Sequence, residues 1–144
     1  MLLLAAVLVV GGAACSDDDD SPVVNLEPES VGVCLDFPPD TGAEVTDLPE
    51  VECGVEHTHE IIAITNSKAE VYPGFEALEE EAQAACLAAF EPYVGINPFD
   101  SDLFVSWLVP TLTTWDRDDD RQIVCVVGNL NGKPLVGTVE DSAR

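Results

Sequence analysis

Residues 75–93 read FEALEEEAQAACLAAFEPY, and this stretch decides the fold. Its apolar residues and its cysteine recur at helical spacing and form one stripe, which comprises Phe75, Leu78, Ala82, Cys86, Ala89 and Phe90. Glutamates cluster near its start, where a helix dipole favours negative charge. Pro92 is expected to end or kink the helix, because proline lacks the N–H that the helical ladder needs. The stretch therefore predicts one main helix with a single buried face.

Extended segments lie on both sides of this helix. Runs rich in apolar and β-branched residues, bounded by turn residues, are typical of strands. We expect strands at residues 31–37, 51–53, 60–65, 103–109, 122–127 and 135–139. A short helical turn is expected at residues 111–115. Together these elements predict an α+β fold, in which one main helix packs on a small antiparallel sheet of four to six strands.

The beginning of the chain has the features of an export signal. Residues 2–10 are almost uniformly apolar and residues 11–14 are small, as in a signal peptide that ends at a cleavage site. This apolar run is too short to cross a bilayer as a helix, which needs about 20 residues. The small residues before Cys15 resemble the lipobox of bacterial lipoproteins, whose cysteine carries a diacylglycerol group. We assign residues 1–14 to a signal peptide and expect lipidation of Cys15, with an ordinary secreted protein as the alternative.

An acidic segment follows Cys15. Residues 16–30 read SDDDDSPVVNLEPES, which combines a charge run with two prolines and few large apolar groups. Such a segment cannot bury enough apolar surface to fold, and its charges keep it extended. We therefore expect residues 15–30 to be a disordered tether that carries the lipid. Residues 31–144 are expected to form one folded domain, since about 110 residues suffice for one domain and are too few for two.

Four cysteines lie within the expected domain: Cys34, Cys53, Cys86 and Cys125. An even number in an exported domain predicts two disulfides, whereas a zinc site favours close Cys-x-x-Cys pairs, which the sequence lacks. Four cysteines allow three pairings. We favour Cys34 with Cys53, between neighbouring strands, and Cys86 with Cys125, between the helix and the most hydrophobic strand. The two pairings that join Cys86 to Cys34 or to Cys53 stay open.

The charge balance restricts the partners that the chain can bind. Its 144 residues include 28 Asp and Glu against five Lys and Arg, which gives a formal net charge of -23. A domain this acidic repels phosphate backbones and anionic lipid headgroups, so we expect no nucleic-acid binding. We interpret the acidic groups as a solvated surface, and a patch for basic partners or cations is the alternative.

Short motifs occur along the domain in a characteristic order. They are Val31-Gly-x-Cys34, Val51-Glu-Cys53, His57-x-x-Glu60, Tyr72-Pro-Gly74, Cys86, Tyr93-Val-Gly95, Pro110-Thr111, Trp115 and Asp120-Arg-x-Ile-Val-Cys125. In this order they resemble the septum formation domain of actinobacterial membrane proteins and lipoproteins, over about residues 31–139. The resemblance implies an extracytoplasmic domain linked to cell division, with no established enzymatic activity.

Two short segments hold side chains that can bind a metal ion. Residues 56–60, EHTHE, hold both histidines of the chain, and on an extended strand His57 and His59 project to the same side. Because no third ligand is evident, we expect a polar loop or edge strand and no metal or other cofactor. Residues 116–120, DRDDD, begin like a calcium-binding loop but lack its glycine and its final glutamate. A solvated turn is the better interpretation of this second segment.

The sequence carries no motif for nucleophilic catalysis, because Gly-x-Ser-x-Gly is absent and the four domain cysteines are expected to be oxidised. We therefore predict a non-enzymatic, lipid-anchored extracytoplasmic module at the outer face of the cell membrane. Its expected partners are the membrane, through the N-terminal lipid, and envelope proteins that take part in envelope or septum assembly. The alternatives are a small metal-binding protein or enzyme centred on His57 and His59, or a domain that senses a ligand in the envelope.

Overall fold

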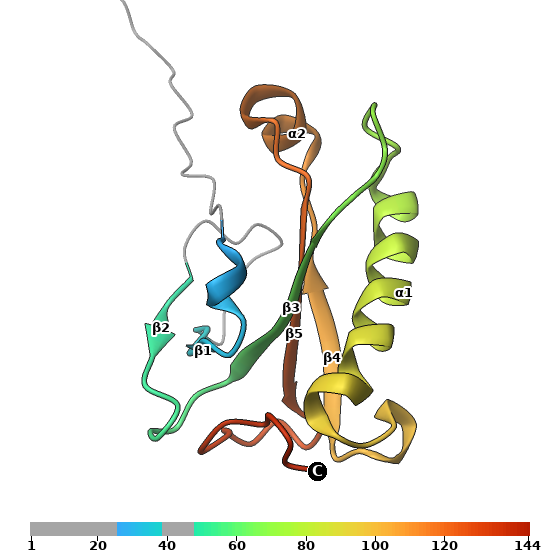
Figure 1. The fold of residues 1–144 in the computed structure, drawn as a ribbon. Helices are drawn as coiled ribbons and strands as arrows, with labels where there is room; N and C mark the ends of the chain where they lie inside the picture. The colour runs from blue at the N-terminus through green and yellow to red at the C-terminus, as the bar shows by residue number, and fades with distance from the viewer. Residues whose placement is uncertain (1–25, 39–47) are drawn as a thin grey trace, which may run out of the picture.

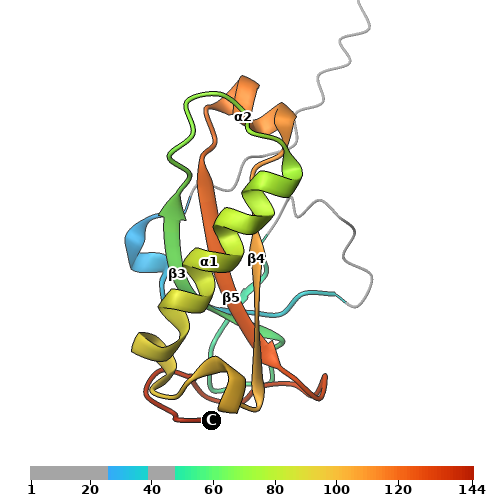
Figure 2. The same cartoon turned by 90° about the vertical axis from the view of Figure 1, so that its right-hand side faces the viewer.

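The computed structural model describes residues 26–38 and 48–144. In chain order the elements are η1 (Pro28–Ser30), β1 (Cys34–Leu35), β2 (Glu50–Val51), β3 (His59–Asn66), α1 (Phe75–Val94), η2 (Pro98–Asp100), β4 (Leu103–Leu108), α2 (Leu112–Asp118) and β5 (Gln122–Asn129). The five strands form one antiparallel sheet in the order β2-β1-β3-β5-β4. Helix α1 lies along one face of this sheet (Figure 1, Figure 2). The predicted α+β fold with one main helix is confirmed.

Strand β5 lies at the centre of the core because both of its faces are covered. Alternate residues of a strand point to opposite faces of the sheet. Those that pack in the cluster formed with α1 are Ile123, Cys125 and Val127. Those that pack in the cluster on the other face are Val124 and Val126. Leu26 and Leu35, from the N-terminal part of the described chain, and Ile61 of β3 complete the buried residues of this second cluster.

Helix α1 follows the predicted apolar stripe through most of its length. Its buried residues recur at every fourth position and are Leu78, Ala82, Cys86, Phe90 and Val94. Phe75, at the first position of the helix, is instead 60% exposed. The helix also continues past Pro92 to Val94, so Pro92 does not end it. Gly95 ends it in a left-handed conformation with φ 89°, which favours glycine.

Both favoured disulfides are formed. Cys34 of β1 is joined to Cys53, which follows β2, with 5.3 Å between their Cα atoms. Cys86 of α1 is joined to Cys125 of β5, with 5.2 Å between their Cα atoms. The two bridges close loops of 19 and 39 residues. Loops of this size lower the entropy of the unfolded chain enough to stabilise the fold by about 3 and about 4 kcal/mol.

The C-terminal segment, residues 133–144, differs from the prediction. The strand expected at residues 135–139 is wrong, because the segment makes only an isolated bridge between Leu135 and His57. Gly137 has a φ of 82°, which interrupts extended backbone. The segment instead runs across one end of the sheet (red in Figure 1), where Leu135 and Val139 are buried.

The N-terminal part of the described chain differs from the expectation in two ways. Its strand is shorter than predicted, and the packed region begins earlier in the sequence. Of the strand predicted at residues 31–37, only Cys34–Leu35 pairs as β1. Of residues 26–30, expected in the tether, Leu26 packs on the domain: its side chain is buried, and its backbone N–H and C=O bond the Gln122 side chain. Cys15 and the expected signal peptide lie outside the described residues. Within residues 26–38 and 48–144, no helix is both long and apolar enough to cross a membrane.

Candidate functional site

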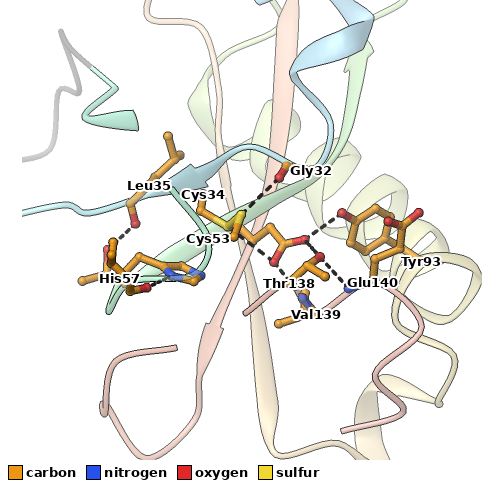
Figure 3. The surroundings of a disulfide bond; sticks show 12 residues. Gly32, Cys34, Leu35, Cys53, His57, Tyr93, Thr138, Val139 and Glu140 are labelled. Atoms are coloured by element: carbon orange, nitrogen blue, oxygen red, sulfur yellow. Dashed lines mark hydrogen bonds between the residues drawn. A yellow bond between two sulfur atoms is a disulfide. The ribbon is translucent and has the colours of Figure 1, made fainter. Parts of the chain in front are cut away.

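Glu60 of β3 is a fully buried carboxylate, 0% exposed, at the end of the sheet that the C-terminal segment covers. Its Oε1 accepts hydrogen bonds from the Tyr93 hydroxyl at 2.7 Å and the Thr138 hydroxyl at 2.6 Å. Its Oε2 accepts one from the Val139 N–H at 2.7 Å (Figure 3). Burying a carboxylate without such donors is costly. The three bonds therefore join β3 to α1 and to the C-terminal segment.

The surroundings of the Tyr93 phenol favour its protonated form, which donates the hydrogen bond to Glu60. It lies in the last turn of α1, and burial is the main reason that its pKa is raised. The hydrogen bond to Glu60 and the charge of that carboxylate raise the pKa of Tyr93 further. The phenol consequently stays protonated and donates its hydrogen throughout the neutral pH range.

His57 lies beside Glu60 and is 1% exposed. Its backbone exchanges two hydrogen bonds with Leu135, of 3.0 and 2.7 Å, which hold it in place. Its Nδ1 lies 2.8 Å from the Val55 carbonyl oxygen. Because a carbonyl oxygen only accepts, Nδ1 carries a proton, and in the neutral ring Nε2 presents a lone pair. That Nε2 is buried and has no hydrogen-bond partner within residues 26–38 and 48–144.

The Cys34–Cys53 disulfide adjoins both side chains. Cys34 faces Glu60 across the β1–β3 ladder, and its Sγ lies 3.8 Å from Glu60 Oε2. One ligand atom each of Cys34, His57 and Glu60 lie within 4.8 Å of one another. Figure 3 shows the His57 ring pointing toward the disulfide. Cys34 is buried, whereas Cys53 is half-buried and so lies nearer to solvent.

The two histidines that the sequence analysis paired lie in different surroundings. His59 lies edge-on between the rings of Phe37 and Phe104, at centroid distances of 5.3 and 5.8 Å. Burial, and then the charge of His57, lowers the pKa of His59. Within the described chain, the group that could hold a metal contains His57 with Cys34 and Glu60, and not His59. A bend at Thr58 breaks the regular alternation on which the pairing rested.

The acidic segment at residues 116–120 forms ion pairs and a hydrogen bond with neighbouring residues of the fold. Asp118 ends α2 and pairs with Arg117, while Asp119 pairs with Arg121 at 2.9 Å. Asp120 accepts a hydrogen bond from the Gln122 N–H. In the part of the chain that the structure describes, no group of three metal-capable side chains includes these aspartates.

A shallow groove lies on the surface where the last turns of α1 meet η2. Its lining residues are Leu87, Ala88, Glu91, Pro92, Asn97, Pro98 and Phe99. Phe99 is 84% exposed, the largest exposed fraction among the large apolar residues of the described chain. The Asn97 side chain accepts a hydrogen bond from the Phe99 N–H at 3.0 Å and so fixes the turn that presents this ring. The lining holds one acidic side chain and no basic one.

Sequence reasoning missed the central role of Glu60, its donors Tyr93 and Thr138, and the groove. The sequence places Glu60 in residues 56–60 and in the motif His57-x-x-Glu60, but neither pattern shows that its carboxylate is buried. One local signal was available, because an acid directly before the apolar run Ile61–Ile64 of a strand must either face solvent or find donors. For the groove, the sequence Asn97-Pro98-Phe99 was a signal, since an Asn-Pro turn fixes the conformation around the ring.

Comparison with known proteins gave one match. A family model described as septum formation matches residues 15–127. This range includes α1, all five strands except the last two residues of β5, and the four bridged cysteines. No curated protein matches the chain, and neither does any solved structure.

Proposed function

Because the chain belongs to the septum formation family, we propose that it is a non-enzymatic module on the outer face of the cell membrane that binds an envelope protein during septum assembly. The family indicates a role in cell division or the envelope. In this proposal, the apolar leader is removed and a lipid on Cys15 anchors the chain, as the resemblance of residues 11–15 to a lipobox suggests.

The exposed ring of Phe99 is the observation that carries the binding role. Large apolar side chains held in a fixed conformation at a groove are typical anchors of protein–protein interfaces. Leu87, Pro92 and Pro98 line the same groove and add apolar surface beside the ring. Burial of this surface by a partner would remove it from water at a gain of about 25 cal/mol per Å².

The charge of the chain indicates the chemistry of the partner. With a net charge of -23, two copies of this chain repel each other, which disfavours self-association through the groove. Glu91 supplies a negative charge within the lining. The partner segment that fits is therefore apolar with at least one lysine or arginine, because opposite charge speeds association and selects the partner.

Binding is favoured over catalysis by the place of the chemically capable side chains. Glu60 and His57 are both buried and lie under the C-terminal segment, and all four domain cysteines are bridged. An interaction role needs none of these groups to reach solvent, whereas a hydrolytic or transfer reaction does.

The test replaces Phe99 in cells that depend on this chain. Phe99→Ser should lower the affinity for the partner about tenfold or more, as loss of a central aromatic anchor does. Cells that produce it should therefore form fewer septa and grow longer than cells with the unaltered chain. Phe75→Ser is the matched control, since Phe75 is an exposed aromatic on α1 outside the groove.

Both variants should keep the thermal stability of the unaltered protein, because both rings are exposed. Equal septum counts for Phe99→Ser and Phe75→Ser would contradict the proposal that the groove is the binding site.

A further inference from the structure

We propose that the Cys34–Cys53 disulfide masks a metal site, which forms with His57 and Glu60 when a dithiol reduces the bridge. The four side chains would supply two thiolates, one imidazole and one carboxylate. Four donors of these kinds are typical of tetrahedral zinc, and Co²⁺ takes the same geometry. The site is independent of the surface groove, because it lies inside the fold on the side of the C-terminal segment.

His57 already has the arrangement of a metal ligand. Metal-binding histidines usually donate one ring N–H to a carbonyl or carboxylate, which orients the other nitrogen toward the ion. Here Nδ1 donates to the Val55 carbonyl at 2.8 Å, and Nε2 is buried with no hydrogen-bond partner among the described residues. A buried acceptor without a partner costs free energy, and an ion at Nε2 would remove that cost.

Glu60 can still bind an ion through Oε2, the carboxylate oxygen that lies near Cys34. Its Oε1 accepts two hydrogen bonds and is saturated, whereas its Oε2 accepts only the one from Val139. Oε2 is also the oxygen that lies 3.8 Å from Cys34 Sγ. The donors Tyr93, Thr138 and Val139 would hold the carboxylate in position, as outer partners of metal ligands do.

The position of Cys53 makes the bridge open to reduction. Cys53 is half-buried in the turn at residues 53–55, which the hydrogen bond from Val55 N–H to the Glu52 carbonyl closes. A thiolate of the dithiol attacks Cys53 Sγ, forms a mixed disulfide and releases Cys34 as a thiolate. The second thiol of the dithiol then releases Cys53, and the dithiol leaves as a disulfide after donating two electrons.

Binding of a divalent ion to the two reduced cysteines leaves the net charge of the buried centre unchanged. Each of the two thiols loses its proton to solvent as the ion binds. The two thiolates offset the two charges of the ion, so the buried centre gains no net charge relative to its oxidised form. In that oxidised form the sulfurs are bonded to each other, and only His57 and Glu60 remain as donors, too few for a tetrahedral protein site.

The experiment uses the whole protein, as cells make it, with Co²⁺ as the probe and a phosphine as the reductant, since a phosphine adds no competing thiol. The reduced protein should bind one Co²⁺ per chain and show the near-ultraviolet thiolate-to-cobalt absorption band. The oxidised protein should show no such band. Circular dichroism recorded at each step shows whether the reduced protein is folded.

Variants separate this site from the other cysteines. The double variant Cys34→Ser, Cys53→Ser should lose the band, although it keeps Cys86 and Cys125. The matched double variant Cys86→Ala, Cys125→Ala should keep it. His57→Gln should weaken Co²⁺ affinity at least tenfold.

Four results would overturn the proposal: no band in reduced and folded protein, reduced protein that stays unfolded with Co²⁺ present, an equal band in the double serine variant, or unchanged affinity in His57→Gln.

Discussion

Glu60 joins parts of the chain that are far apart in sequence. Its donors come from α1 and from the C-terminal segment, separated from it by 33 to 79 residues. The same carboxylate lies beside His57 and the Cys34–Cys53 bridge. One side chain thus sets the position of the C-terminal segment and the surroundings of the disulfide.

At this residue, Glu60→Gln should lower the free energy of unfolding by about 2 kcal/mol or more, because the amide nitrogen must face a donor and leaves it unsatisfied. Denaturant unfolding of both proteins measures this difference. Glu52→Gln is the matched control, since Glu52 is exposed, and should change stability by less than about 0.5 kcal/mol. Equal stability of the two variants would show that the three hydrogen bonds do not hold this end of the fold.

Among the elements, those that bury a continuous stripe could be predicted from the sequence. Helix α1 and strand β5 place apolar residues at fixed spacing against a core. The spacing of apolar residues in the sequence therefore predicts which residues of these elements are buried. The same reasoning located both disulfides. Cys86 and Cys125 lie on the facing stripes of α1 and β5, and Cys34 and Cys53 lie on or directly after the neighbouring strands β1 and β2.

Elements held by distant polar contacts could not be predicted in this way. Residues 135–139 are rich in apolar and β-branched residues as strands are, yet Leu135 and Val139 are both buried, and the Thr138 hydroxyl donates a hydrogen bond to the Glu60 carboxylate. Nothing near Thr138 in sequence signals a partner 78 residues away. The groove differs in this respect, because all of its lining residues lie within residues 87–99 and the Asn97-Pro98-Phe99 turn is a local signal for it.

The two bridges should differ in their reactivity. Cys86 and Cys125 are both fully buried between α1 and β5, whereas Cys53 is half-buried in a turn. Under mild reduction without denaturant, Cys34 and Cys53 should become alkylated well before Cys86 and Cys125, because an attacking thiolate needs access to one sulfur. Mass spectrometry of peptides at successive times measures both rates. Simultaneous opening of the bridges would mean that the difference in burial does not control reduction.

The whole molecule combines a stapled domain with an acidic surface and an expected anchor at its N-terminus. A net charge of -23 is expected to repel nucleic acid and anionic headgroups. A lipid on Cys15 would then be the means of holding it at the membrane, with residues 16–25 as the spacer.

The anchor is tested by Cys15→Ala, which removes the sulfur that a lipid would modify. This variant should move from the membrane fraction to the soluble fraction, because the resemblance to a lipobox predicts that the lipid is the anchor. Ser16→Ala, one residue further along, keeps the sulfur and should stay with the membrane. Fractionation followed by detection of the chain measures both. If Cys15→Ala and the unaltered chain partition alike, the lipid anchor is wrong.

The most direct test of the account is where the chain lies in dividing cells. A fusion to a fluorescent protein that folds after export, imaged through the division cycle, measures its distribution along the envelope. The account predicts enrichment at the forming septum for the unaltered chain and for Phe75→Ser, and loss of this enrichment for Phe99→Ser. An even distribution of the unaltered chain around the envelope at every stage of division would contradict a role in septum assembly.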